Sequence, residues 1–177
     1  MAKQRKKRIS AKSSIMEMNI KTARQKKNWM SAAIPERGLG HIVMQAGRTF
    51  GNAMQQRLVS HGVTLSQWLH LRALFDNKGM TQSALSKYLG VEKASSTAIL
   101  NHLESHQLIR RITNEKDRRI TNLELTVAGV AFVRKVIPNA VEVNSIARKG
   151  LTRREMTTFV YVMRTMIENL QNFEGPI

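Results

Sequence analysis

The amino-acid sequence predicts a mainly helical fold with one small β-hairpin, and three observations support this. Apolar residues recur at three- and four-residue steps from Leu39 onward, as they do on the buried face of amphipathic helices. Two β-branched runs, 108–113 and 120–125, flank a charged tip, which is the pattern of a hairpin. Two short helical segments joined at Gly90 precede that hairpin. This order of elements is the outline of a winged helix-turn-helix with long helices at both ends.

The first two helices are predicted from their periodicity and end signals. The apolar positions of the first are Leu39, Ile42, Val43, Ala46, Phe50, Ala53, Met54 and Leu58. That helix should end near Gly62. The second should begin after Thr64, with Thr64 or Ser66 as its N-cap, and should stop at 77–79.

The central pair of helices has the strongest local signals. The hydroxyl of Thr81 can cap the third helix, and Gly90 suits the left-handed turn after it. The fourth helix is expected over 92–105 and has two different sides. The side expected to be buried carries Ser96, Ile99, Leu100 and Leu103. The other is short, polar and nearly free of acid, and carries Lys93, Ser95, Ala98, Asn101 and His102.

Two further helices are expected after the hairpin. Thr126 should cap one running to about Arg148, and Thr152 with Glu155 forms a capping box for the last. The apolar stripe of the last helix is Met156, Phe159, Val160, Met163, Met166, Ile167 and Leu170. The terminal helices carry more apolar surface than a small winged domain can cover, so we expect them to form a homodimer. The expected divisions are a basic, partly flexible extension (1–37), a first dimerisation helix (38–62), the winged domain (63–126) and the C-terminal dimerisation helices (127–177).

The net charge of +17 predicts a polyanionic partner, and nucleic acid is the commonest one. Residues 1–37 contain 11 basic and 2 acidic residues, which is more than half of the net charge. This extension is interpreted as a solvated tail, an arm that contacts DNA, or a strap on a partner subunit, and composition does not choose among these. An anionic membrane surface or ribosomal RNA would favour the same charge.

Several classes of function have no support in the sequence. Cysteine is absent, and the five histidines show no metal-ligand spacing, so neither a metal nor another cofactor is expected. No catalytic triad order, phosphate-binding glycine loop or carboxylate pair stands out, and we predict that the protein is not an enzyme. No apolar run approaches a membrane span, and no signal-peptide core follows the basic start. A cytoplasmic protein without a membrane partner is therefore expected.

Residues 62–129 resemble the MarR family of winged helix-turn-helix transcription regulators. The resemblance rests on three motifs in the right order. They are the turn motif Thr81, Leu85, Leu89, Gly90 and Val91, the wing's Asp-Arg-Arg, and the exit motif Leu123 to Gly129. It implies a homodimeric binder of double-stranded DNA at a pseudo-palindromic operator, often a repressor that a small phenolic or aromatic acid releases.

The resemblance also implies the residues that contact DNA. On the recognition helix these are Lys93, Ala94, Ser95 and Thr97, with Asn101 or His102 taking over a contact, because Ala98 stands where the family usually has an arginine. On the wing they are Lys116, Asp117, Arg118 and Arg119, with Asp117 orienting Arg119 into the minor groove. Arg110 and Arg111 are candidate phosphate contacts. Gln107 replaces the usual glycine before the first wing strand, which predicts a slightly different turn.

The family's ligand pocket lies near the first, second and fifth helices. Candidate residues for it here are Arg48, His61, Trp68, His70 and Arg72. The predicted function is therefore a homodimeric repressor released by a small anionic or aromatic ligand. The alternative is a sequence-indifferent nucleic-acid-binding or chromosome-architectural protein that uses its basic arm. A further alternative is an interaction module that reuses the fold without DNA.

Overall fold

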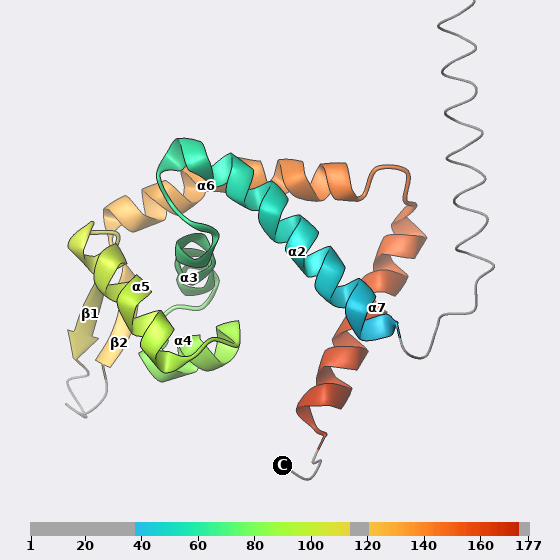
Figure 1. Ribbon diagram of the computed structural model, residues 1–177. Helices are drawn as coiled ribbons and strands as arrows, with labels where there is room; N and C mark the ends of the chain where they lie inside the picture. The colour runs from blue at the N-terminus through green and yellow to red at the C-terminus, as the bar shows by residue number, and fades with distance from the viewer. Residues whose placement is uncertain (1–37, 114–120, 174–177) are drawn as a thin grey trace, which may run out of the picture. The chain divides into compact units, whose positions relative to one another are not determined.

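The computed structural model describes residues 38–113 and 121–173 (Figure 1). Its elements are α2 (Leu39–Leu58), the 3-10 turn η1 (Val59–His61), α3 (Leu65–Asp76), α4 (Gln82–Leu89), α5 (Lys93–Ser105), β1 (Ile109–Thr113), β2 (Thr121–Leu125), α6 (Val127–Ala147) and α7 (Arg153–Gln171). The chain divides into two units at Arg48–Thr49, inside α2, and the packing described below lies in the second unit. The predicted mainly helical fold with one hairpin is confirmed.

Threonine hydroxyls cap the N-termini of four helices. Each accepts a hydrogen bond from the backbone N–H three residues further on, and the caps are Thr64, Thr81, Thr126 and Thr152. Thr64, and not Ser66, is therefore the cap of α3, and Gln67 completes a capping box with it. Each such cap stabilises its helix by about 1 kcal/mol, which explains why the predicted helix starts agree so closely with the structure.

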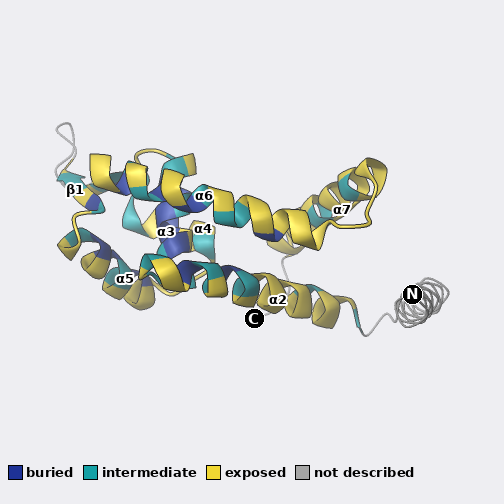
Figure 2. Cartoon of the chain, turned by 90° about the horizontal axis from the view of Figure 1, so that it is seen from above, coloured by how far each residue is buried: buried dark blue, intermediate teal, exposed yellow. Residues whose placement is uncertain are grey.

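Helix α3 forms the centre of the winged domain. It packs against α4, α5, α6 and β2, and Figure 2 shows it as the most deeply buried helix of this domain. The core includes Trp68 and Leu71 from α3, Leu85 from α4, Leu100 and Leu103 from α5, Ile109 and Leu123 from the strands, and Val133 and Val136 from α6. Apolar burial on every side of α3 therefore fixes the position of the recognition helix α5 relative to the wing strands.

The hairpin pairs β1 with β2 in antiparallel register. Ile109 lies opposite Leu125, and Thr113 lies opposite Thr121. The N–H of Leu123 donates to the carbonyl of Met80 over 2.8 Å, so β2 is also joined to the start of α4. This additional bridge ties the wing to the helix-turn-helix.

The end of α5 turns through a left-handed residue. Gln107 has φ +57°, and its N–H donates to Glu104 O while that of Leu108 donates to Leu103 O. These two bonds form a Schellman motif, a helix ending that normally places glycine at the left-handed position. The expectation of a different turn at this position was wrong, because Gln107 adopts the conformation that glycine favours.

The exit from the hairpin packs very closely on this turn. Thr126 Oγ1 donates to Gln107 O over 2.6 Å, and the N–H of Gly129 donates to the same hydroxyl over 3.0 Å. A Cβ on Gly129 would lie 1.9 Å from Leu108 O. Only glycine allows α6 to approach the start of β1 so closely, which accounts for the last residue of the exit motif.

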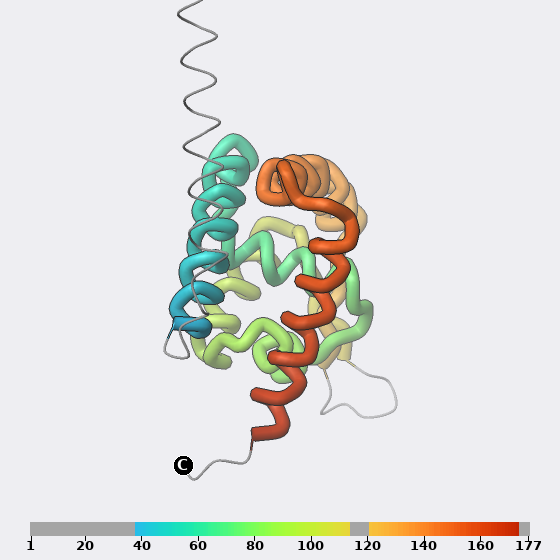
Figure 3. Tube along the Cα trace, turned by 90° about the vertical axis from the view of Figure 1, so that its right-hand side faces the viewer, coloured from blue at the N-terminus to red at the C-terminus, as the bar shows by residue number. Residues whose placement is uncertain are grey.

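After α6 the chain turns at Gly150, which has φ +81°, and continues as α7 (Figure 3). No residue of α7 is buried, although the predicted apolar stripe lies along it. Phe159, Ile167 and Leu170 expose 55%, 49% and 72% of their surface. Within the described part of the chain, no helix is long and apolar enough to cross a membrane.

Candidate nucleic-acid interface

The recognition helix α5 presents the polar face that its sequence predicted. Lys93, Ala94 and Ser95 are exposed in its first turn, and Asn101 and His102 are exposed further along. Glu92 is the N-cap residue but its side chain makes no capping bond, so the N–H groups of the first turn have no side-chain cap. A helix N-terminus with free N–H groups and a lysine attracts phosphate. This end of α5 is therefore suited to a backbone phosphate.

Thr97 is engaged within the protein. Its Oγ1 donates to Lys93 O over 2.7 Å and accepts from Gln82 Nε2 at the start of α4 over 2.5 Å. The single hydroxyl proton is therefore used, and Thr97 is half-buried. One lone pair of Oγ1 and the methyl group remain for a ligand, and the methyl group suits an apolar contact such as a thymine methyl.

His102 is held by Gln67 from α3. The distance from Gln67 Nε2 to His102 Nδ1 is 3.1 Å, and Gln67 Oε1 accepts from the N–H of Thr64 over 2.8 Å. Because the capping box uses the amide oxygen, the amide nitrogen faces His102 and donates to it. His102 Nδ1 is then the acceptor, so the neutral ring carries its proton on Nε2.

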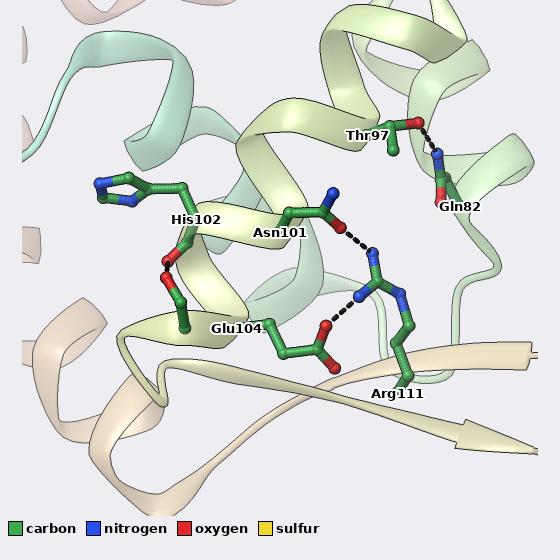
Figure 4. A network of polar contacts seen from close by, with 7 residues as sticks. Gln82, Thr97, Asn101, His102, Glu104 and Arg111 are labelled. Carbon is green, nitrogen blue, oxygen red and sulfur yellow. Dashed lines mark hydrogen bonds and ion pairs between the residues drawn. The ribbon is translucent and has the colours of Figure 1, made fainter.

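Asn101 is held by Arg111 from the first wing strand (Figure 4). Arg111 Nη2 donates to Asn101 Oδ1 over 2.9 Å, and Nη1 forms an ion pair with Glu104. Both partners lie on α5, so one guanidinium joins the strand to the recognition helix at two points. The guanidinium proposed from sequence as a phosphate contact is thus occupied inside the domain.

Arg110, the other strand residue proposed to contact phosphate, has different surroundings from Arg111. Arg110 forms an ion pair of 3.0 Å with Glu124 on the neighbouring strand, and 63% of its side chain is exposed. Its contact is at the surface, where such pairs contribute about 0–1 kcal/mol, so it remains accessible to a phosphate. Lys116, Asp117, Arg118 and Arg119 lie outside the described residues.

A buried polar contact supports α5 from behind. His70 Nδ1 lies 2.7 Å from Ser66 O, and Nε2 lies 3.1 Å from Ser96 Oγ. A carbonyl only accepts, so Nδ1 carries the proton and the Ser96 hydroxyl donates to Nε2. Burial lowers the pKa of His70, against a smaller opposing effect of its bond to Ser66.

Sequence inspection did not single out the side chains that hold the polar face in place. They are Gln67, Gln82 and Glu104, and none belongs to the exposed face itself. Gln67 could have been found, because it stands three residues after the capping Thr64. Gln82 reaches α5 from α4, and Glu104, itself on α5, acts through Arg111 of β1. Such contacts between separate elements leave no pattern in the sequence.

The residues proposed for a ligand pocket lie in different surroundings. Trp68 and His70 are buried in the core, and His61 Nε2 lies 2.7 Å from Asn139 Nδ2. Arg72 pairs with Asp76 over 2.7 Å, and Arg48 is exposed on α2. Each of the four candidates in the second unit therefore has a structural role, through burial or through a polar contact with a neighbouring side chain.

An open pocket of about 600 Å³ lies elsewhere, between the end of α3, β2 and the start of α6. Its apolar lining is Leu74, Phe75, Leu123, Leu125 and Val130. Lys78, Glu124 and Arg134 supply charge, and Glu124 is paired with Arg110. None of the five sequence candidates lines it. An apolar pocket with two cations suits a small organic anion.

Comparison with known proteins agrees with this fold. The sequence model of the MarR family matches residues 63–121, which span α3, α4, α5, β1 and the start of β2. This match places the winged-helix segment of the chain in the MarR family. The resemblance inferred from the turn, wing and exit motifs is thereby confirmed, and the regulator is not an enzyme.

Three relatives illustrate the match. The transcriptional repressor NicR of Pseudomonas putida is 28% identical over 134 residues, covering 76% of this chain and 85% of NicR. The structure of Bordetella bronchiseptica BpsR, whose DNA binding is regulated by 6-hydroxynicotinic acid, has a TM-score of 0.65 at 25% identity, over 72% of this chain and 97% of BpsR. A Listeria monocytogenes MarR-family regulator in complex with 26mer DNA has a TM-score of 0.71 at 19% identity, over 75% of this chain and 88% of its own. Together these matches identify the protein as a transcriptional regulator.

Proposed function

We propose that this MarR-family regulator is a homodimeric repressor of a pseudo-palindromic DNA operator. The observation that carries the proposal is the exposed polar face of α5, whose side chains are held in place from α3, α4 and β1. Such preorganisation limits the conformational entropy lost when a side chain meets a base edge. A merely solvated helix face does not require these contacts.

The dimer is supported by the exposed apolar surface of α7. Its stripe has no buried member, and Phe159 and Val160 expose 55% and 44% of their surface. Exposed apolar stripes of this length are typical of surfaces that a partner covers. Two reading heads in one dimer would meet successive major grooves about 34 Å apart, which predicts a near-palindromic site.

Electrostatic anchoring is proposed for the basic wing residues. Arg119 is proposed to enter the minor groove beside Asp117, and Lys116, Arg118 and Arg110 to meet phosphates. Neutralising several phosphates releases counterions, so affinity should fall about 10³-fold or more between about 50 and 200 mM salt. The net charge of +17 supports this steep dependence.

Selection of bound duplexes from random DNA tests the proposal, followed by footprinting at physiological salt. We expect an enriched inverted repeat and a bounded footprint. Arg119→Ala should weaken binding to that site, and Ser95→Ala should weaken it too. Uniform protection of unrelated DNA would instead favour the sequence-indifferent alternative, and unchanged binding by both variants would favour a module that does not use DNA.

The pocket between α3, β2 and α6 is proposed as the effector site. Its apolar lining suits an aromatic ring, and Lys78 and Arg134 suit a carboxylate. BpsR, whose DNA binding responds to an aromatic acid, supports a ligand of this class. A ligand here would contact β2 directly and change the position of the wing, which lowers affinity for DNA by linkage.

A panel of aromatic carboxylic acids tests the effector site by titration and by loss of the DNA complex. Lys78→Met and Arg134→Met should each weaken the response about tenfold or more, because each removes a charge-assisted contact. Lys135→Met, at the neighbouring exposed position of α6, is the matched control. Equal loss in the control would show that general charge, and not this pocket, binds the acid.

A further inference from the structure

Asn101 is the exposed polar side chain of α5 whose orientation the structure determines most fully. Arg111 Nη2 lies 2.9 Å from Asn101 Oδ1. The same guanidinium forms an ion pair with Glu104, which lies about one helical turn after Asn101 on α5. Arg111 is held from two sides, with 30% of its side chain exposed. It therefore behaves as a fixed donor beside Asn101.

This contact settles which way the Asn101 amide faces. Arginine has only donors, so the atom that meets it must be the amide oxygen. The amide nitrogen then points away from Arg111, and Asn101 is exposed. A base edge that meets Asn101 encounters two N–H donors, with a positive guanidinium next to the only acceptor.

Base edges respond differently to such a side chain. A free asparagine binds adenine by donating to N7 and accepting from the N6 amino group, whereas guanine presents two acceptors, N7 and O6. With Oδ1 held by Arg111, the adenine amino group would face a cation. An acceptor-only edge meets no such conflict and gains from the nearby positive charge.

We infer that Arg111 turns Asn101 into a donor-only reader that selects guanine over adenine in the major groove. This inference rests on the proposed DNA-reading function of α5 and names the base that one position of each half-site requires. Arg111 acts through Asn101 and is a positioning residue, without a base contact of its own.

The neighbouring side chain has the same polarity for an independent reason. His102 accepts from Gln67 at Nδ1, so its outward nitrogen, Nε2, is a donor in the neutral ring. The capping box of α3 determines this tautomer, and Arg111 takes no part in it. Two successive residues of α5 thus offer donors, which extends the preference for acceptor-rich base edges.

The test measures base preference with the full-length protein by selection from random duplex DNA. Asn101→Ala identifies the position that Asn101 reads, because the preference at that position alone should flatten. For the wild type we expect guanine over adenine there by about tenfold. Replacing that guanine with 7-deazaguanine should weaken the wild type about fivefold and leave Asn101→Ala unaffected.

The double variant Arg111→Met, Glu104→Gln releases the amide without leaving an unpaired carboxylate. We expect adenine to become tolerated about as well as guanine at the position that Asn101 reads. The matched control is Arg57→Met, Glu142→Gln, which removes an ion pair of 2.7 Å between α2 and α6 with no contact to α5. The control should keep the wild-type preference. Thermal unfolding of each variant establishes that it is folded, and the 7-deazaguanine measurement needs only the wild type and Asn101→Ala.

The outcomes separate the two levels of the proposal. An enriched operator with adenine at the position that Asn101 reads would overturn the inference and leave the repressor proposal standing. Unchanged preference in the folded double variant would also overturn it. Absence of any enriched sequence for the wild type would overturn the proposed function itself, and the inference with it.

Discussion

The Nε2 atom of His70 lies 3.1 Å from the Oγ atom of Ser96, and this contact joins α3 to the buried side of the recognition helix. Both side chains are almost completely buried, at 1% and 0% exposure. A buried polar pair is costly unless both partners are satisfied, and here each one is. The position of α5 therefore depends on the neutral state of one histidine.

Stability should fall as the pH drops below the ordinary histidine pKa of about 6.5. Burial lowers the pKa of folded His70, so below that value the unfolded chain binds more protons than the native protein. The free energy of unfolding is then fully retained above pH 6.5 and decreases by up to about 1.4 kcal/mol per pH unit below it. Urea unfolding of the wild type and His70→Gln at pH 7.5, 6.5 and 5.5 measures this. An equal slope in the variant would contradict the assignment to His70.

Gly129→Ala should destabilise the domain by about 1–3 kcal/mol, because overpacking forces backbone to move. The new Cβ would lie 1.9 Å from Leu108 O, which also accepts from the N–H of Thr126. Ala131→Ser, at an exposed position of the same helix, should change the free energy of unfolding by at most about 0.5 kcal/mol. Thermal or urea unfolding compares the two. A Gly129→Ala protein as stable as the control would show that α6 can shift without cost.

Gln107→Gly should stabilise the protein by about 0.5–1 kcal/mol. The left-handed conformation costs a non-glycine residue about 1–2 kcal/mol, and part of that gain is offset by the greater freedom of glycine in the unfolded chain. Gln107 has φ +57°, and its backbone bonds do not involve the side chain. Gln107→Ala keeps the strain and should leave stability nearly unchanged. A destabilised glycine variant would mean that the glutamine side chain contributes a contact of its own.

Phe159→Glu should weaken self-association about tenfold or more, because it places a charge on the exposed apolar stripe of α7. Thr158→Glu adds the same charge at the neighbouring exposed position outside that stripe, and it should associate like the wild type. Sedimentation equilibrium measures both variants. Loss of the dimer should also weaken binding to a palindromic site more than binding to a half-site. Equal effects of the two variants would place the interface elsewhere.

The helix boundaries were largely predictable because their determinants are local. The caps at Thr81, Thr126 and Thr152 act over three residues, and the left-handed turn at Gly90 requires only its own backbone. The turn after α5 was not predictable from Gln107. Its conformation is imposed by the bonds of Leu108 and Thr126 to the surrounding backbone, which outweigh the preference of glutamine for negative φ.

The DNA-reading face illustrates the same division. The sequence by itself determined that α5 has a buried side and a polar side, because burial follows the 3.6-residue period. It also indicated the family, through the turn, wing and exit motifs within residues 62–129. Only the tertiary structure decided which atoms of that polar side are available. The partners of Thr97, Asn101 and His102 come from α4, β1 and α3, and hydrogen bonds between separate elements use up specific donors and acceptors without leaving a period in the sequence.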